Sequence, residues 1–170
     1  MGDVTLAFDP SINYPGFAVF DGKKLIEYGV RKTWAGNSKP SDQARLRKLL
    51  CDVGGLCYQY SPKTVVVEDY QYRHEDVHAN KENLKKMIWS IGVVIVAVPS
   101  QFDLVCFKPH EWKGRKSKEQ TIFEARTAYK IRGDLNNNAA DAIMLGHHFI
   151  TGKGASHLPQ WIAPRKTKRR

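Results

Sequence analysis

The stretch Val65-Val66-Val67-Glu68 decides the fold of this 170-residue chain. Three successive valines without polar alternation are typical of a central strand that is covered on both faces, and such strands usually pair in parallel. The segment Val4 to Asp9 has the period-two pattern of a strand and also ends in an acid. Because a helix is predicted between these two strands, a right-handed crossover can place them side by side.

The remaining elements follow from periodicity, turn residues and helix caps. Strands are predicted near residues 17–20, 25–32 and 104–107, and helices near residues 42–59, 79–98, 117–129 and 137–150. Ser41 is the expected N-cap of the first helix, and its buried stripe is predicted as Leu46, Leu49, Leu50, Val53 and Leu56. This order predicts one α/β domain over residues 1–150: a mixed five-stranded sheet with helices on both faces.

The charge of the chain is strongly positive and unevenly placed. Lys and Arg outnumber Asp and Glu by 27 to 17, a net charge of +10. The tail at 151–170, expected to be flexible, has six basic residues and no acid, and a second basic cluster lies at 108–118. Such patches attract polyanions through the release of counterions. A tail that only increases solubility is the alternative.

The composition excludes a membrane protein and favours a cytoplasmic one. No apolar run approaches the roughly 20 residues that cross a bilayer. The N-terminus enters a strand at once, without the layout of a signal peptide. Cys51, Cys57 and Cys106 lack metal-ligand spacing, and their number is odd, so they are expected to be reduced thiols in the core.

Three acids lie where a carboxylate has no simple structural reason. Asp9 and Glu68 end the two central strands, where ligands bind in open α/β sheets, and Asp141 lies within the alanine-rich helix at 137–150. Carboxylates gathered there repel one another unless a cation neutralises them. Asn138, one helical turn before Asp141, has an amide oxygen of the kind that Mg²⁺ accepts. Each acid alone could instead be a surface charge, or for Asp141 a first-turn acid favoured by the helix dipole.

In combination these residues resemble a known family, the RuvC-type Holliday junction resolvases of the RNase H-like superfamily. The segment Phe8-Asp9-Pro10-Ser11-Ile12-Asn13-Tyr14-Pro15-Gly16-Phe17-Ala18-Val19 is similar to the opening strand and turn of that family. Val65 to Glu68 resembles its second acidic strand, and Asn138 to Asp141 its last acidic helix. The three motifs occur in order and span nearly the whole chain. The short length and reduced loops look more like a phage or viral member than a bacterial one.

The resemblance implies a Mg²⁺- or Mn²⁺-dependent endodeoxyribonuclease that resolves four-way (Holliday) or other branched DNA by paired nicks. In such a site Asp9 bridges two cations about 4 Å apart. Glu68 binds one of these cations, and Asp141 with Asn138 binds the other. One cation generates the attacking hydroxide and the other stabilises the leaving 3′-oxygen, which leaves 5′-phosphate ends.

The resemblance also implies how DNA is held, mainly through phosphates and stacking on aromatic rings. The predicted DNA-binding residues are Tyr70, Tyr72, Arg73, Lys108, Trp112, Lys113, Arg115, Lys116 and Lys118. Trp112 is equally compatible with anchoring its loop to the core. Tyr70 and Tyr72 are each compatible with packing in the core instead.

A two-fold homodimer matches the symmetry of a four-way junction. The helix at 79–98 is the expected interface, because its apolar surface exceeds what one core face needs: Leu84, Met87, Ile88, Trp89 and Ile91.

Two positions depart from the family pattern, and rival functions remain. Asn138 replaces the usual aspartate or histidine, either as a weaker ligand or as a substitution that silences the enzyme. Ser11 replaces a common glycine.

The rival functions are an RNase H-like nuclease for RNA–DNA hybrids or flaps, and a junction-binding protein without catalysis. An actin-like or sugar-kinase ATPase is disfavoured, because the chain is too short for a duplicated fold and lacks a Gly-rich second phosphate loop.

Overall fold

The computed structural model describes residues 3–35, 38–70 and 81–152. Within them the five strands and five helices follow the order β1 (Val4–Asp9), β2 (Gly16–Asp21), β3 (Lys24–Val30), α1 (Asp42–Tyr60), β4 (Thr64–Glu68), α2 (Lys81–Ala97), β5 (Asp103–Phe107), α3 (Pro109–Trp112), α4 (Lys118–Tyr129) and α5 (Asn137–Ile150). The predicted mixed α/β architecture is confirmed. The basic tail from residue 153 onward lies outside the described residues.

The five strands form one sheet in the order β3-β2-β1-β4-β5. The pairs β1–β2 and β2–β3 are antiparallel, whereas β1–β4 and β4–β5 are parallel. The valine strand β4 is therefore central, as its composition predicts, with all three valines fully buried. Because β1 and β4 are parallel neighbours, their carboxyl ends lie at the same edge of the sheet.

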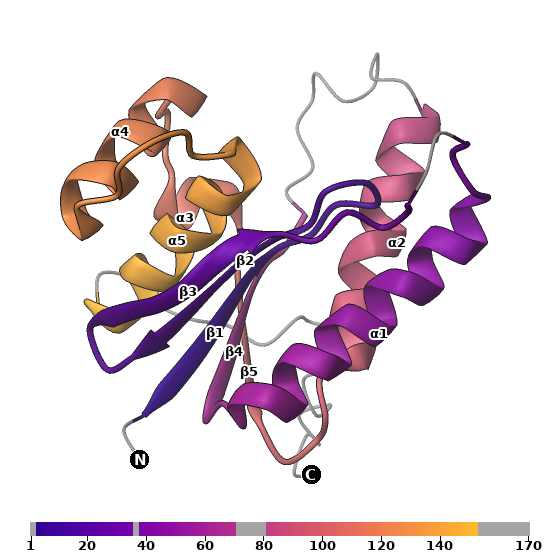
Figure 1. Cartoon of the computed structure of the whole chain (residues 1–170), viewed down its shortest axis with the longest axis horizontal. Coiled ribbons are helices and arrows are strands. Elements are labelled where there is room, and N and C mark those ends of the chain that lie inside the picture. The colour runs from indigo at the N-terminus through magenta and orange to yellow at the C-terminus, as the bar shows by residue number, and fades with distance from the viewer. Residues whose placement is uncertain (1–2, 36–37, 71–80, 153–170) are drawn as a thin grey trace, which may run out of the picture.

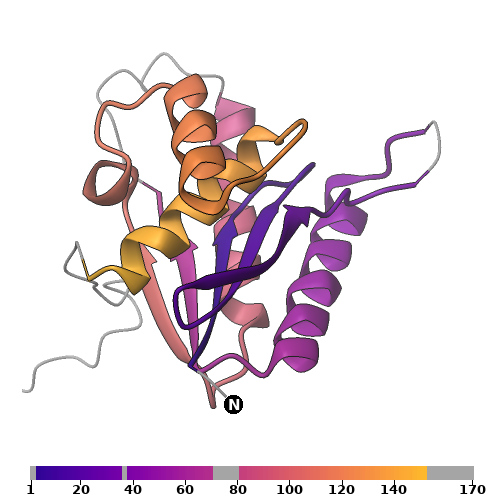
Figure 2. The same ribbon diagram turned by 60° about the vertical axis from the view of Figure 1, so that its left-hand side comes forward.

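Helices cover both faces of the sheet, with α1 and α2 on one side and α3, α4 and α5 on the other (Figure 1; Figure 2 shows the same layers from the side). Alternate strand residues divide between the two cores. Leu6, Val65 and Val67 belong to the core under α1 and α2, and Ala7 and Val66 to the core under α5.

Helix α5 lies unusually close to the sheet because small residues permit it. A Cβ on Gly146 would lie 2.3 Å from the Phe20 ring, and a Cβ on Gly16 would lie 2.0 Å from the backbone oxygen of Asn138. Contacts this short are not tolerated, so only glycine fits at both crossings. The close crossing at Gly16 fixes the N-terminal end of α5 against the start of β2, next to the end of β1.

Two expectations about burial were wrong. On α1, Leu50 is 44% exposed, whereas Arg45 is buried at 3%. Cys51 is exposed, because its position on α1 lies off the buried stripe, which includes Leu49, Val53 and Leu56 as predicted. Cys57 and Cys106 are buried as expected, and burial raises the pKa of their thiols to about 11 and about 12. None of the helices in the described ranges has the length and apolar character needed to cross a bilayer.

Candidate active site

The three predicted acids approach one another at the edge of the sheet where β1 and β4 end. Phe8 is the register partner of Val67, so Asp9 and Glu68 occupy the next positions of two adjacent parallel strands. Both side chains follow the alternation of Ala7 and Val66 and point to the α5 side of the sheet. We refer to Asp9, Glu68 and Asp141 as the carboxylate cluster.

Helix α5 contributes Asp141 to the cluster from above that face. Asp141 is only 8% exposed, so it faces inward as predicted from the alanines around it. Ala139, Ala140 and Ala142 are also buried, and their small side chains let the backbone of α5 come close to the sheet. The N-cap is Asn136, whose side chain accepts from the backbone N–H of Asn138 at 2.9 Å.

The electrostatic state of Asp9 shows that the three carboxylates act on one another. Burial, followed by repulsion from Glu68 and then from Asp141, raises the pKa of Asp9 well above its ordinary value of 3.8, and Lys113 and Lys118 oppose this rise. Burial also raises the pKa of Asp141, again against the effect of nearby Lys113 and Lys118. The cluster is therefore a place where negative charge is costly and a cation is favourable.

Two residues of the predicted basic loop engage the carboxylates directly, which the sequence analysis did not foresee. Trp112 is buried, and its Nε1 donates to Glu68 Oε2 at 2.9 Å. The Nζ of Lys113 lies 2.6 Å from Asp141 Oδ1. Trp112 thus anchors the loop to the core, the second of its two predicted roles, and orients Glu68. Lys113 supplies positive charge inside the cluster, where the prediction had placed it on phosphates.

The short helix α3 brings Trp112 and Lys113 to this position. Pro109 stands at its first turn, and the carboxylate of Glu111 accepts from the backbone N–H of Lys108 at 2.6 Å. Proline in the first turn followed by an acid that caps the helix is a recognisable start signal. The sequence therefore contained the signal for α3, although the segment was interpreted as a loop.

The two asparagines before Asp141 have different partners. Asn138 Nδ2 donates to the carbonyl oxygen of Tyr14, which ties α5 to the turn after β1. Asn137 Nδ2 contacts Asp141 Oδ2 at 3.4 Å, a neighbour that the sequence analysis did not name. Asn138 also lines a cleft of about 370 Å³ together with Asp9, so its position next to the cluster agrees with the prediction.

Among the described residues, no group of three or more His, Cys, Asp or Glu side chains is arranged so that it could hold a metal ion. In this arrangement Trp112 and Lys113 are bound to two of the three carboxylates. A cation that bound to Asp141 Oδ1 would take the place of the Lys113 ammonium.

The other predicted DNA-binding residues lie beside the cluster or outside the described ranges. Arg115, Lys116 and Lys118 are exposed, and Lys116 forms an ion pair with Glu124. Tyr70 is partly buried against the core, which fits its packing alternative. Tyr72 and Arg73 fall within 71–80, outside the described residues.

The sheet order and the helices on both faces give the chain an RNase H-like fold that is similar to that of RuvC. The crossover junction endodeoxyribonuclease RuvC of Akkermansia muciniphila is 25% identical over 165 residues, which cover 90% of this chain and 95% of that protein. The structure of Thermus thermophilus RuvC in complex with a Holliday junction substrate superimposes with a TM-score of 0.67 at 20% identity, over 91% of this chain and 99% of that one.

A more distant structure has the same fold. The yeast mitochondrial Holliday junction resolvase has a TM-score of 0.59 at 14% identity, over 88% of this chain and 78% of that chain. No protein-family model matches the chain. These relatives come from bacteria and yeast, and a phage or viral source stays a prediction.

The raised pKa of Asp9 predicts how the stability of the metal-free protein depends on pH. A carboxyl with a raised pKa binds protons more readily in the folded than in the unfolded state, so stability falls as pH rises from about 3.8 through the folded pKa. Asp9→Asn removes this titration. We therefore expect the variant to gain stability relative to wild type as pH rises from 4 to 7, measured by urea unfolding with a chelator present.

Asp103→Asn, at an exposed position at the start of β5, is the matched control and should follow wild type over this pH range. An Asp9→Asn difference that stays constant with pH would contradict the electrostatic account of the cluster.

Proposed function

We propose that the chain is a structure-specific endodeoxyribonuclease that resolves four-way or branched DNA junctions by metal-dependent hydrolysis of phosphodiester bonds, with paired nicks. The observation that carries this proposal is the convergence of Asp9, Glu68 and Asp141: burial, and then the charges of Glu68 and Asp141, raise the pKa of Asp9. The similarity to a RuvC whose structure is in complex with a Holliday junction substrate supports the choice of substrate.

The chemistry of the cluster fits two Mg²⁺ or Mn²⁺ ions. Carboxylate oxygens are the hard ligands that these cations prefer. The Lys113 ammonium on Asp141 indicates that positive charge is accepted there. Asp9, Glu68 and Asp141 are the proposed ligands. Asn138 is proposed to add its amide oxygen, because its Nδ2 already donates a hydrogen bond to the carbonyl oxygen of Tyr14. When bound, such ions supply a hydroxide nucleophile and stabilise the leaving 3′-oxygen, which gives 5′-phosphate ends.

The chain's own residues have distinct proposed tasks around these ligands. Trp112 holds Glu68 in one orientation through its indole N–H. Lys113 favours the ionised form of Asp141 before substrate binds, against the effect of burial, and it is released toward a DNA phosphate when a cation takes its place. Lys108, Arg115, Lys116 and Lys118 form the positive surface that contacts phosphates without reading sequence. Tyr70, Tyr72 and Arg73 follow Glu68 in the sequence and are proposed to contact the junction centre.

Cleavage of a synthetic four-way junction in Mg²⁺ or Mn²⁺ tests this function. We expect symmetric nicks with 5′-phosphate ends from the wild type, at a rate that Asp9→Asn lowers by about 10³-fold or more, because the shared ligand is lost. Asp103→Asn should cut like the wild type. Flap and RNA–DNA hybrid substrates belong in the same assay. Faster cleavage of either would contradict junction specificity.

Asn138 gives one specific reason to keep a non-catalytic junction-binding protein as the second candidate, because an amide is a weaker cation ligand than a carboxylate. A wild type that binds junctions without cutting them, and that Asn138→Asp does not activate, would establish this alternative. A gain of cutting in Asn138→Asp would exclude it.

We further propose that the active form is a homodimer joined through α2. Ile88 and Trp89 are 47% and 39% exposed, and Val96 is 73% exposed. With residues of α1 they line an apolar groove of about 870 Å³ between the two helices. Apolar surface gathered on one helix in this way favours a protein contact, and two-fold pairing of identical chains suits the paired cuts that a four-way junction requires. Leu84 and Met87 lie on the same helix, whereas Ile91 is buried in the core.

Ile88→Glu tests the dimer, because a charge in the centre of an apolar interface is costly. We expect wild type to have the mass of a dimer at micromolar concentration, and the variant that of a monomer, by size-exclusion chromatography with light scattering. Phe123→Glu, at a 70% exposed position on α4, is the control and should remain dimeric. A monomeric wild type would contradict the proposal.

A further inference from the structure

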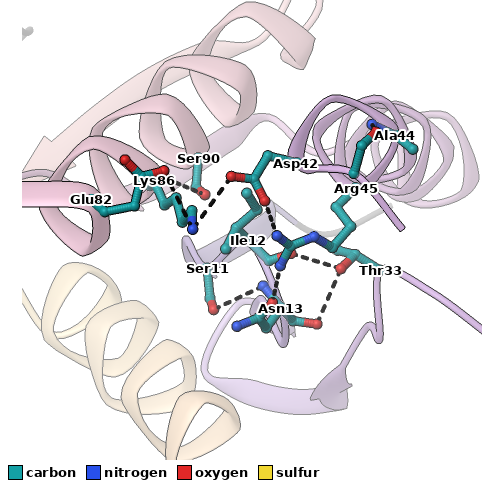
Figure 3. Close-up of polar contacts among 11 residues, drawn as sticks. Ser11, Ile12, Asn13, Thr33, Asp42, Ala44, Arg45, Glu82, Lys86 and Ser90 are labelled. Atoms are coloured by element: carbon teal, nitrogen blue, oxygen red, sulfur yellow. Dashed lines mark hydrogen bonds and ion pairs between the residues drawn. The ribbon is translucent and has the colours of Figure 1, made fainter. Parts of the chain in front are cut away.

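A buried arginine holds the turn that follows Asp9. Arg45 lies on α1 with its side chain 3% exposed. Its guanidinium donates one hydrogen bond to Asn13 Oδ1, in the turn between β1 and β2, and another to Asp42 Oδ1 in the first turn of α1. Figure 3 shows the guanidinium between these two acceptors. One buried group thus connects the helix to the segment that begins immediately after Asp9.

Stability alone does not account for an arginine at this position. A buried ion pair seldom adds net stability compared with apolar side chains of similar volume, because both charged groups lose their hydration. Among the described residues, Arg45 Nε is also buried without a hydrogen-bond partner. The neighbouring face of α1 is filled with leucine and valine, so an apolar residue would have been compatible with the core. The arginine therefore calls for a role outside the core.

The contacts of the turn indicate that role. Thr33 Oγ1 donates to the carbonyl oxygen of Ile12 at 2.6 Å, and Asn138 donates to the carbonyl oxygen of Tyr14. These contacts hold the backbone of the turn from the end of β3 and from α5. The Asn13 side chain is held by Arg45, from α1. The turn is thus fixed from three directions within a few residues of Asp9.

The same network extends to α2. The Lys86 ammonium lies 3.4 Å from Asp42 Oδ2 and 3.4 Å from Glu82 Oε1, as the dashed lines in Figure 3 show. Although desolvation acts in the opposite direction, Arg45 and Lys86 lower the pKa of Asp42. Asp42 therefore stays ionised at neutral pH and joins the two basic groups. Asp9, Asn13, Arg45 and Lys86 all line the cleft of about 370 Å³ that borders the carboxylate cluster.

We propose that Arg45 is a positioning residue for Asp9: it fixes the turn at residues 10–15 relative to α1 and, through Asp42 and Lys86, relative to α2, so that the Asp9 carboxylate is presented to the cations in one orientation. This inference rests on the proposed function, because it takes Asp9 to be the shared cation ligand. Arg45 itself touches neither cation nor DNA in this account.

Binding of Mn²⁺ to the full chain without DNA tests the proposal, with free Mn²⁺ counted by electron paramagnetic resonance. Arg45→Met removes the guanidinium, and Asn13→Ala removes its acceptor in the turn while leaving the Arg45–Asp42 pair. Both should weaken Mn²⁺ binding about tenfold, the usual effect of losing a group that orients a metal ligand. The double variant should be no weaker than either single variant, because the two residues act through one contact.

Lys48→Met is the matched control, because it breaks an exposed ion pair with Asp52 on the same helix and should leave Mn²⁺ binding unchanged. A merely structural role for Arg45 lowers the melting temperature but leaves the Mn²⁺ affinity of folded protein as in wild type, and that result would overturn the proposal. If Arg45→Met does not fold, Asn13→Ala alone decides. Failure of the wild type to bind Mn²⁺ would instead refute the proposed function itself.

Discussion

Mutual repulsion among three carboxylates is the constraint on which this molecule depends. Asp9 and Glu68 end neighbouring parallel strands and Asp141 faces them from α5, so that each adds to the cost of ionising the shared site. A protein that needed only stability would not gather acids at a partly buried edge of its sheet. Lys113, paired with Asp141 at 2.6 Å, relieves part of this cost. We interpret its ammonium as the internal partner that a divalent cation replaces.

The rest of the fold holds these three side chains together. The parallel pairing of β1 with β4 puts two acids at one edge of the sheet, and the glycines at positions 16 and 146 let α5 come close enough to add the third. Helix α3 then places Trp112 on Glu68, while Arg45 and Asn138 fix the turn after Asp9 from opposite sides. Each contact orients one of the proposed ligands or the segment that carries it, as expected of a metal site supported by surrounding hydrogen bonds.

Much of this arrangement could be predicted from the sequence, because periodicity and acid placement are local signals. The valine run identified the central strand, and the alanines around Asp141 identified an inward-facing acid. The partners of the acids could not be predicted in the same way, since the contacts of Lys113 with Asp141 and of Trp112 with Glu68 join residues 28 and 44 positions apart. Lys113 was predicted only as one member of a basic patch, and no local signal in the sequence marks Arg45 as a buried residue of α1.

We propose that Asp9, Glu68 and Asp141 bind divalent cations together. X-ray diffraction from crystals grown with Mn²⁺, recorded at a wavelength where manganese scatters anomalously, tests it most directly. The account predicts anomalous peaks among the three carboxylates, with the Lys113 ammonium withdrawn from Asp141. Lys113 still bonded to Asp141, with no manganese peak beside Asp9, would contradict it.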